Sequence, residues 1–89
     1  MIKNSVTISN KLGLHARASA KLTKLAGTFA CDIHLARAGR RINAKSIMGV
    51  MMLAAGLGAE VEIETHGPDE EQAMAALRDL IDSKFGEGQ

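Results

Sequence analysis

The sequence predicts an α+β domain of two layers, an antiparallel sheet with helices on one face and water on the other. Apolar residues recur with periods that alternate between about two and about 3.6, which gives the element order β-α-β-β-α-β-α. Glu60, Glu62 and Glu64 share one face of the last predicted strand, so that face must be solvated. The chain has 89 residues, the size of one domain, and residues 1–89 are expected to form it without a linker or repeat.

Glycines and capping residues delimit the predicted elements. These elements are strands at residues 2–8, 31–36, 40–43 and 59–65, and helices at residues 16–26, 46–55 and 70–81. The first helix is expected to end at Gly27, and a tight turn at residues 38–39 joins the second and third strands. Ser46 is expected to cap the second helix. Asp69 is expected to cap the third, with Gln72 at the capping-box position.

Composition excludes several classes of function. The net charge is +1, so a general electrostatic grip on nucleic acid is not expected. The chain has 2 Phe and no Trp or Tyr, which leaves no aromatic platform for single-stranded nucleic acid. The one cysteine, Cys31, is expected to be a buried small hydrophobe in a reducing compartment. There is no secretory leader and no apolar run near the ~20 residues of a membrane span, so we expect a cytoplasmic protein.

The segment at residues 10–20 joins the first strand to the first helix and places His15 at the N-cap position. Histidine is a poor cap, and a broken local rule of this kind is typical of functional positions. The backbone N–H groups of Ala16, Arg17 and Ala18, the helix dipole and the Arg17 guanidinium would together stabilise a phosphate on His15. Imidazole can form such covalent intermediates. A lone histidine at a loop–helix junction is more often an ordinary surface residue, so these features alone leave its role open.

A resemblance to a known family is carried by two segments, NKLGLHAR at residues 10–17 and KSIMGVMML at residues 45–53. The first resembles the active-site signature of the HPr family, the histidine phosphocarriers of the bacterial phosphotransferase system, including their nitrogen-related paralogue. The second resembles the second-helix signature of the same family. The resemblance extends over essentially the whole chain, in the same order and at the same length.

The resemblance implies a fold and a reaction. HPr proteins have a four-stranded antiparallel sheet in the order 1-4-2-3 with three helices on one face, which agrees with the predicted element order. It implies that His15 accepts a phosphoryl group on Nδ1 from the phosphohistidine of enzyme I and passes it to a histidine of an enzyme IIA domain. It also implies that Arg17 stabilises the phosphate, and that the chain is a monomeric carrier with no cofactor and no turnover of its own.

Ser46 is a second candidate site, although its simplest role is to cap a helix. In family members served by an HPr kinase/phosphorylase, the serine at this position carries a regulatory phosphate, and the resemblance implies the same for Ser46. A phosphoserine adds about −1.5 to −2 charges at neutral pH. Next to an interface that already accommodates a phosphate at His15, this charge should slow transfer by repulsion.

Exposed methionines near His15 would form an adaptable docking surface for several partners, although apolar residues at helical spacing more often belong to a core. The resemblance implies that partners contact five apolar positions on the two helices, and two lysines beside them would form a basic rim that steers partners. The positions are Ala16, Ala20, Lys24, Lys45, Ile47, Met48 and Met51.

One position departs from the family, because Ala18 stands where members commonly have proline. Proline is pre-organised for a first helical turn, but alanine is an excellent helix former, so the helix is still expected. The tail, with Gly86 and Gly88, is expected to fray, and no role is assigned to it. His34 and His66 have no neighbouring ligand pattern, so no metal site is expected.

Two other functions remain open on the residues alone. A ligand-binding regulatory domain of the ACT or ferredoxin-like type has a similar element order and would bind its ligand at a sheet edge or dimer interface without His15. A signalling adaptor would act mainly through Ser46, without a phosphorelay. Neither function requires an acid-labile phosphate on histidine, which a carrier does require.

Overall fold

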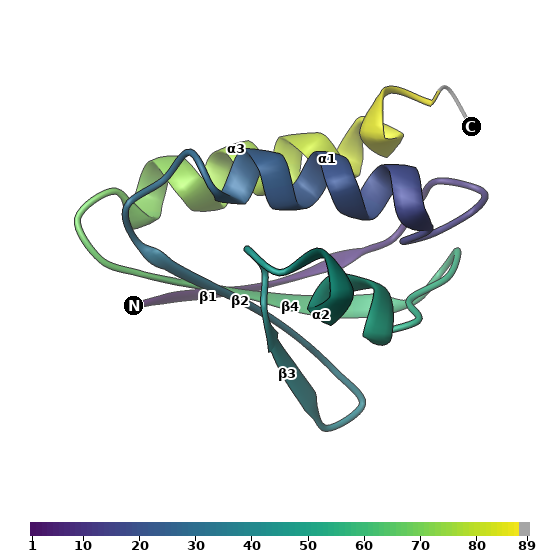
Figure 1. Ribbon diagram of the computed structural model, residues 1–89, viewed down its shortest axis with the longest axis horizontal. Coiled ribbons are helices and arrows are strands. Elements are labelled where there is room, and N and C mark those ends of the chain that lie inside the picture. Colours follow the sequence, from purple (N-terminus) through teal and green to yellow (C-terminus); the bar gives the residue numbers. More distant parts are fainter. Residues whose placement is uncertain (88–89) are drawn as a thin grey trace.

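The computed structural model describes residues 1–87 of the chain (Figure 1). Alternating apolar residues form its strands, as the sequence predicts. The elements are β1 (Ile2–Thr7), α1 (Ala16–Ala26), β2 (Asp32–Arg37), β3 (Arg40–Asn43), α2 (Ile47–Met52), β4 (Glu60–His66), α3 (Glu70–Asp82) and a short 3₁₀ turn, η1 (Lys84–Gly86).

The strands form one antiparallel sheet of four strands in the order β1-β4-β2-β3, which confirms the order implied by the resemblance. β4 is a central strand, with Val61 opposite Val6 of β1 and Ile63 opposite Leu35 of β2. Figure 1 shows α1 and α3 side by side over one face of the sheet, with α2 next to α1 and β3. The helix layer therefore presents the start of α1 at one end of the molecule.

The core lies between the sheet and the helix layer. Ile33, Leu35 and Ile63 point into it from the strands and are fully buried. Leu22 of α1 and Leu77 of α3 are equally buried in the same cluster. Burial of each such side chain contributes about 1.5–3 kcal/mol relative to its exposure in water, and this packing holds α1 and α3 against the sheet. Within residues 1–87, no helix has the length and hydropathy that a membrane crossing requires.

The outer face of the sheet differs from the prediction at one residue. Glu60 is exposed, but Glu64 is only 5% exposed, so the expectation that all three glutamates lie in water is wrong. Because β4 is central, Glu64 lies between Lys3 of β1 and His34 of β2. Arg41 donates two hydrogen bonds to its carboxylate, at 3.0 and 3.3 Å, and these hold the pKa of Glu64 below its usual range despite burial.

Helix α2 is shorter than the helix predicted at residues 46–55. Two arginines of the β2–β3 hairpin bind carbonyl groups at the end of α2. Arg37 donates to the carbonyl of Leu53 at 3.0 Å, and Arg40 donates to that of Met52 at 2.9 Å. These guanidinium groups take the place of further helical N–H donors at the negative end of the helix dipole. The hairpin arginines therefore satisfy the last carbonyls of α2, and the chain leaves the helix at Ala54, whose φ of +51° is left-handed.

Asp69 precedes α3, as predicted, but its side chain does not cap that helix. Its carboxylate instead accepts hydrogen bonds from the backbone N–H groups of Ala30 at 2.8 Å and Cys31 at 2.9 Å. The backbone hydrogen bond expected at Gln72 is made two residues earlier by Glu70, whose carboxylate accepts from the N–H of Gly67 at 3.0 Å. Cys31 is buried as predicted. Burial, together with the Asp69 carboxylate, raises the pKa of its thiol to about 11.

Candidate functional site

Helix α1 spans the predicted residues, with His15 as its N-cap residue and Gly27 as its C-cap. His15 has extended backbone angles (φ −74°, ψ −179°), and its carbonyl accepts the first helical hydrogen bond, from Ser19 at 2.8 Å. The imidazole makes no capping hydrogen bond and keeps 28% of its side-chain surface exposed. The first N–H groups of the helix, at Ala16 and Arg17, therefore lie beside an imidazole that leaves them free for another acceptor.

The loop before His15 is held by close packing. Gly13 has a left-handed φ of +66°, and a Cβ there would lie 2.5 Å from the carbonyl oxygen of Ala55. The next residue, Leu14, donates its N–H to that same carbonyl at 2.8 Å. Asn10 is fully buried and donates from Nδ2 to the carbonyl of Gly13 at 2.8 Å. Glycine is required here because it alone permits both the backbone conformation and the close approach.

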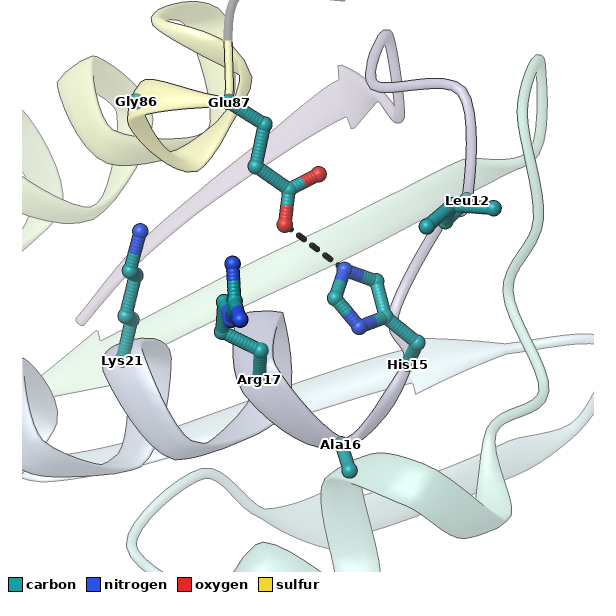
Figure 2. A pocket seen from close by; sticks show the side chains of 7 residues that line it. All are labelled: Leu12, His15, Ala16, Arg17, Lys21, Gly86 and Glu87. Carbon is teal, nitrogen blue, oxygen red and sulfur yellow. Dashed lines mark hydrogen bonds and ion pairs between the residues drawn. The ribbon is translucent and has the colours of Figure 1, made fainter.

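An open cavity of about 680 Å³ lies over the start of α1 (Figure 2). Figure 2 shows Arg17 and Lys21 projecting from α1 toward the turn that carries Gly86 and Glu87, on the same side as the imidazole. The cavity is lined by Leu12, His15, Ala16, Arg17, Lys21, Gly86 and Glu87. The structure thus brings together His15, Ala16 and Arg17 as predicted, whereas Ala18 is fully buried beneath them.

Glu87, like Lys21, is a charged residue of this cavity that sequence reasoning missed. Its Oε2 lies 2.6 Å from Nε2 of His15, and its side chain is only 12% exposed (Figure 2). The expected fraying of the tail is wrong up to this residue, because Phe85 is 1% exposed and fixes the turn. Gly88 lies outside the described residues. In the sequence, only the aromatic residue Phe85, two positions before the acidic Glu87, could have suggested this contact.

Ser46 caps α2 as predicted. Its Oγ accepts a hydrogen bond from the N–H of Gly49 at 3.2 Å, and its backbone is extended (φ −109°, ψ 115°). The residue is exposed, and it does not line the cavity at His15. Ser46 and His15 therefore occupy the starts of two different helices that contact each other.

The docking positions proposed from the resemblance lie mostly on the surface. Met48 is 66% exposed and Met51 is 40% exposed, and Val50 is the buried residue of α2. Lys45 is less free, because its Nζ donates to the carbonyl of Phe29 at 2.8 Å. The remaining predicted positions are exposed, namely Ala16, Ala20, Lys24 and Ile47. Further exposed apolar side chains, which the sequence analysis did not include, are Leu12, Met52 and Leu57.

Metal chemistry has no support in the part of the chain that the structure describes. Within residues 1–87, no group of three or more His, Cys, Asp or Glu side chains converges on a point that could hold a metal ion. His34 belongs to the solvated face of the sheet and His66 is exposed at the end of β4.

Comparison with known proteins gives consistent matches over the whole chain. The family model described as "PTS HPr component phosphorylation site" matches residues 2–83. The phosphocarrier protein HPr of Cupriavidus necator is 62% identical over 89 residues, which cover 100% of both chains. The crystal structure of HPr-C-His from Thermoanaerobacter tengcongensis has a TM-score of 0.95, with 45% identity over 98% of each chain. The HPr dimer from the same organism has a TM-score of 0.79 and 45% identity, over 98% of this chain and 100% of that chain.

Proposed function

The chain belongs to the HPr family, the phosphocarriers of the phosphotransferase system, and we propose that it carries the phosphoryl group on Nδ1 of His15. The donor is the phosphohistidine of enzyme I, and the acceptor is a histidine of an enzyme IIA domain. The observation that carries the proposal is the His15 imidazole at an N-cap position where it makes no capping hydrogen bond. Family membership favours this role over a ligand-binding regulatory domain, which would not need that imidazole.

The transfer step balances with the groups at the site. The lone pair on Nδ1 forms a new P–N bond while the P–N bond of the donor breaks, and that electron pair returns to the donor nitrogen. The transferred group is trigonal and negatively charged at the transition state. The N–H groups of Ala16 and Arg17, the positive end of the helix dipole and the Arg17 guanidinium stabilise this charge. Lys21, which also lines the cavity, adds a second cation.

Partners dock on the exposed apolar surface made by the start of α1 and by α2. Met48 and Met51 supply flexible, polarizable contacts that fit more than one partner, and this suits a carrier that must meet enzyme I and an enzyme IIA domain in turn. Lys24 lies exposed at the last turn of α1, where it steers acidic partners. Interfaces of this kind are small enough to release each partner quickly.

The direct test is phosphorylation by phosphoenolpyruvate and enzyme I. One phosphate per chain is expected, labile in acid and stable in base, and absent in His15→Ala. Arg17→Ala should still fold and should accept the group about tenfold or more slowly, because one positioned cation is lost. An adduct that persists in His15→Ala would overturn the assignment.

A second, regulatory phosphorylation is proposed at Ser46. The Ser46 hydroxyl is exposed at the start of α2, where a phosphate dianion is favoured by the helix dipole, so the mark should not unfold the domain. Its effect falls on partners, through repulsion of the phosphate on the incoming enzyme. An HPr kinase with ATP should give an acid-stable phosphate that is absent in Ser46→Ala. An active kinase that leaves the protein unmarked would remove this proposal.

We also propose that the carrier works as a cytoplasmic monomer. A free cysteine such as Cys31 is typical of a reducing compartment. A monomer leaves both helix starts open to partners, whereas a relative from Thermoanaerobacter tengcongensis is described as a dimer. Light scattering during size-exclusion chromatography should give a mass near 9.4 kDa, and a mass of twice that value would contradict the monomer.

A further inference from the structure

We propose that Glu87 is a positioning residue, whose carboxylate accepts the Nε2–H of His15 and so keeps the Nδ1 lone pair free for phosphoryl transfer. The inference rests on the proposed function, since it concerns the nitrogen that receives the phosphoryl group. Its physical basis is the contact of 2.6 Å between Nε2 and Oε2 of Glu87 (Figure 2). Within residues 1–87 this is the one hydrogen bond of the imidazole ring.

The protonation state of Glu87 decides which atom of the pair carries the hydrogen. Burial of the Glu87 carboxylate opposes its ionisation, but hydrogen bonds from His15 and Asn10 outweigh burial and hold the pKa of Glu87 below its usual range. An ionised carboxylate can only accept. The hydrogen in the contact therefore belongs to Nε2, and the neutral imidazole that satisfies the contact has its unprotonated nitrogen at Nδ1.

The backbone that delivers Glu87 is strained and firmly held. Lys84, Phe85 and Gly86 have consecutive left-handed φ angles of 58°, 54° and 72°, which are unfavourable for the two residues that are not glycine. The buried ring of Phe85 and a hydrogen bond of 2.6 Å from Lys21 Nζ to the Phe85 carbonyl hold this turn in place. Strain of this kind is typical of functional segments whose surroundings over-determine the conformation.

The second oxygen of the carboxylate is held as well. Asn10 Nδ2 donates to Oε1 of Glu87 at 3.1 Å and also to the carbonyl of Gly13 at 2.8 Å. Asn10 is fully buried, so it links the loop before His15 to the C-terminal turn at a fixed distance. The arrangement Asn10–Glu87–His15 orients a carboxylate that in turn orients the imidazole, as in other sites where a carboxylate fixes the tautomer of a catalytic histidine.

The same contact serves both directions of transfer. When Nδ1 forms the P–N bond, the hydrogen stays on Nε2, so the ring of the phosphohistidine becomes cationic. The Glu87 carboxylate faces that positive charge across the Nε2–H. When the P–N bond breaks toward the next acceptor, the electron pair returns to Nδ1 and the neutral tautomer is restored. No proton has to leave or enter the site in either step.

The first test measures the imidazole itself, without any partner. Nitrogen-15 NMR of His15, recorded where the ring is neutral, should show one Nε2–H tautomer and a slowly exchanging Nε2–H signal. Glu87→Ala should lose the slow exchange and mix the two tautomers. The control Glu71→Gln alters an exposed carboxylate in the first turn of α3, at the opposite end of the helix layer from the start of α1 (Figure 1), and should leave the signal unchanged.

The second test measures phosphoryl transfer from enzyme I. Glu87→Ala should accept the group at His15 about tenfold more slowly, the order of loss that follows removal of a residue that orients a metal-binding histidine, and Glu71→Gln should match the wild type. An unchanged tautomer and Nε2–H signal in Glu87→Ala would overturn the inference, as would an unchanged or faster transfer. In each of those cases the phosphate would still form at His15, so the proposed function would stand. Its own failure is marked by an adduct in His15→Ala.

Discussion

The starts of α1 and α2 place two candidate phosphorylation sites in the same local position with opposite chemistry. His15 and Ser46 are both N-cap residues with extended backbones. Ser46 binds the N–H of Gly49 with its own hydroxyl, whereas the imidazole of His15 makes no such bond and turns to Glu87 instead. One helix start is closed by its own side chain, and the other is left open for a ligand.

This difference shows what a phosphoryl carrier requires of a helix. A good cap stabilises the helix by about 1 kcal/mol, and α1 forgoes that contribution. In exchange, its N–H groups and its dipole remain available for a charge that arrives and leaves. α2 is short and needs its cap, so a phosphate on Ser46 would have to replace a hydrogen bond that already stabilises the fold.

The largest expected effect comes from closing the open helix start with His15→Ser. Phosphoryl acceptance from enzyme I should be lost entirely, since the nucleophilic imidazole is gone. At the same time, His15→Ser should be more stable than His15→Ala by about 1 kcal/mol, because the serine hydroxyl caps α1. Urea unfolding of the two variants measures the difference. Equal stabilities would mean that the α1 amides are already satisfied and that the contrast with α2 is false.

A large loss of stability is expected for Gly13→Ala, because Gly13 lets the loop before α1 touch the segment that follows α2. The new Cβ would need both a left-handed φ and space that the Ala55 carbonyl occupies at 2.5 Å. Gly39→Ala is the matched control, since Gly39 also has a positive φ (+82°) but no atom within 4 Å of a new Cβ. Gly13→Ala should be less stable than this control by about 1–3 kcal/mol in urea unfolding. Equal losses in the two variants would show that close approach at Gly13 has no cost.

A smaller effect is expected for Ser46→Ala. Loss of the hydroxyl that binds the Gly49 N–H should lower the free energy of unfolding by about 1 kcal/mol, measured in urea. Transfer from enzyme I to His15 should continue at the wild-type rate, because Ser46 does not line the cavity. A clear fall in transfer would show that the two helix starts are coupled.

The smallest effect concerns the third helix start, where Asp69 neither caps α3 nor reacts. The backbone N–H of Ala30 donates to the Asp69 carboxylate, and Cys31 donates to it as well. These hydrogen bonds hold the pKa of Asp69 below its usual range, although burial opposes the shift. Because the pKa of Asp69 is depressed in the folded protein, its contribution to the stability of the fold is fully present above about pH 4, the pKa of this group in the unfolded chain. The contribution is lost as the pH falls through the pKa of the folded protein. Asp69→Asn should therefore lower Tm near neutral pH, and the Tm difference should be smaller at an acidic pH below the unfolded value. A Tm difference between the two proteins that is the same at both pH values would contradict this account.

Most of the fold could be predicted from the sequence because it depends on local periodicity. The bounds of α1 and β3, the turn at residues 38–39 and the cap at Ser46 follow from patterns of a few neighbouring residues. The strand order does not follow from such patterns, and it came from the resemblance to the HPr family. The errors lie where distant residues decide the outcome. Arg41 covers Glu64 from 23 positions away, and Asp69 binds backbone 38 positions away.

The candidate site divides in the same way. His15 and Arg17 are recognisable because they belong to one contiguous segment with a local anomaly at the cap position. Glu87 is not recognisable, because its contact with His15 joins residues 72 positions apart and depends on three left-handed residues. Helical propensity and glycine content predict fraying at such a tail. Only the burial of Phe85 reverses that expectation.

The buried Cys31 gives this protein a built-in reporter of unfolding. Cys31 is 1% exposed, and burial with the Asp69 carboxylate nearby raises the pKa of its thiol to about 11, so in the folded protein the thiol should resist alkylating reagents near neutral pH. Labelling then requires that the junction between β2 and the start of α3 opens. The rate at which a mass label accumulates on Cys31 would time that opening, without any engineered probe.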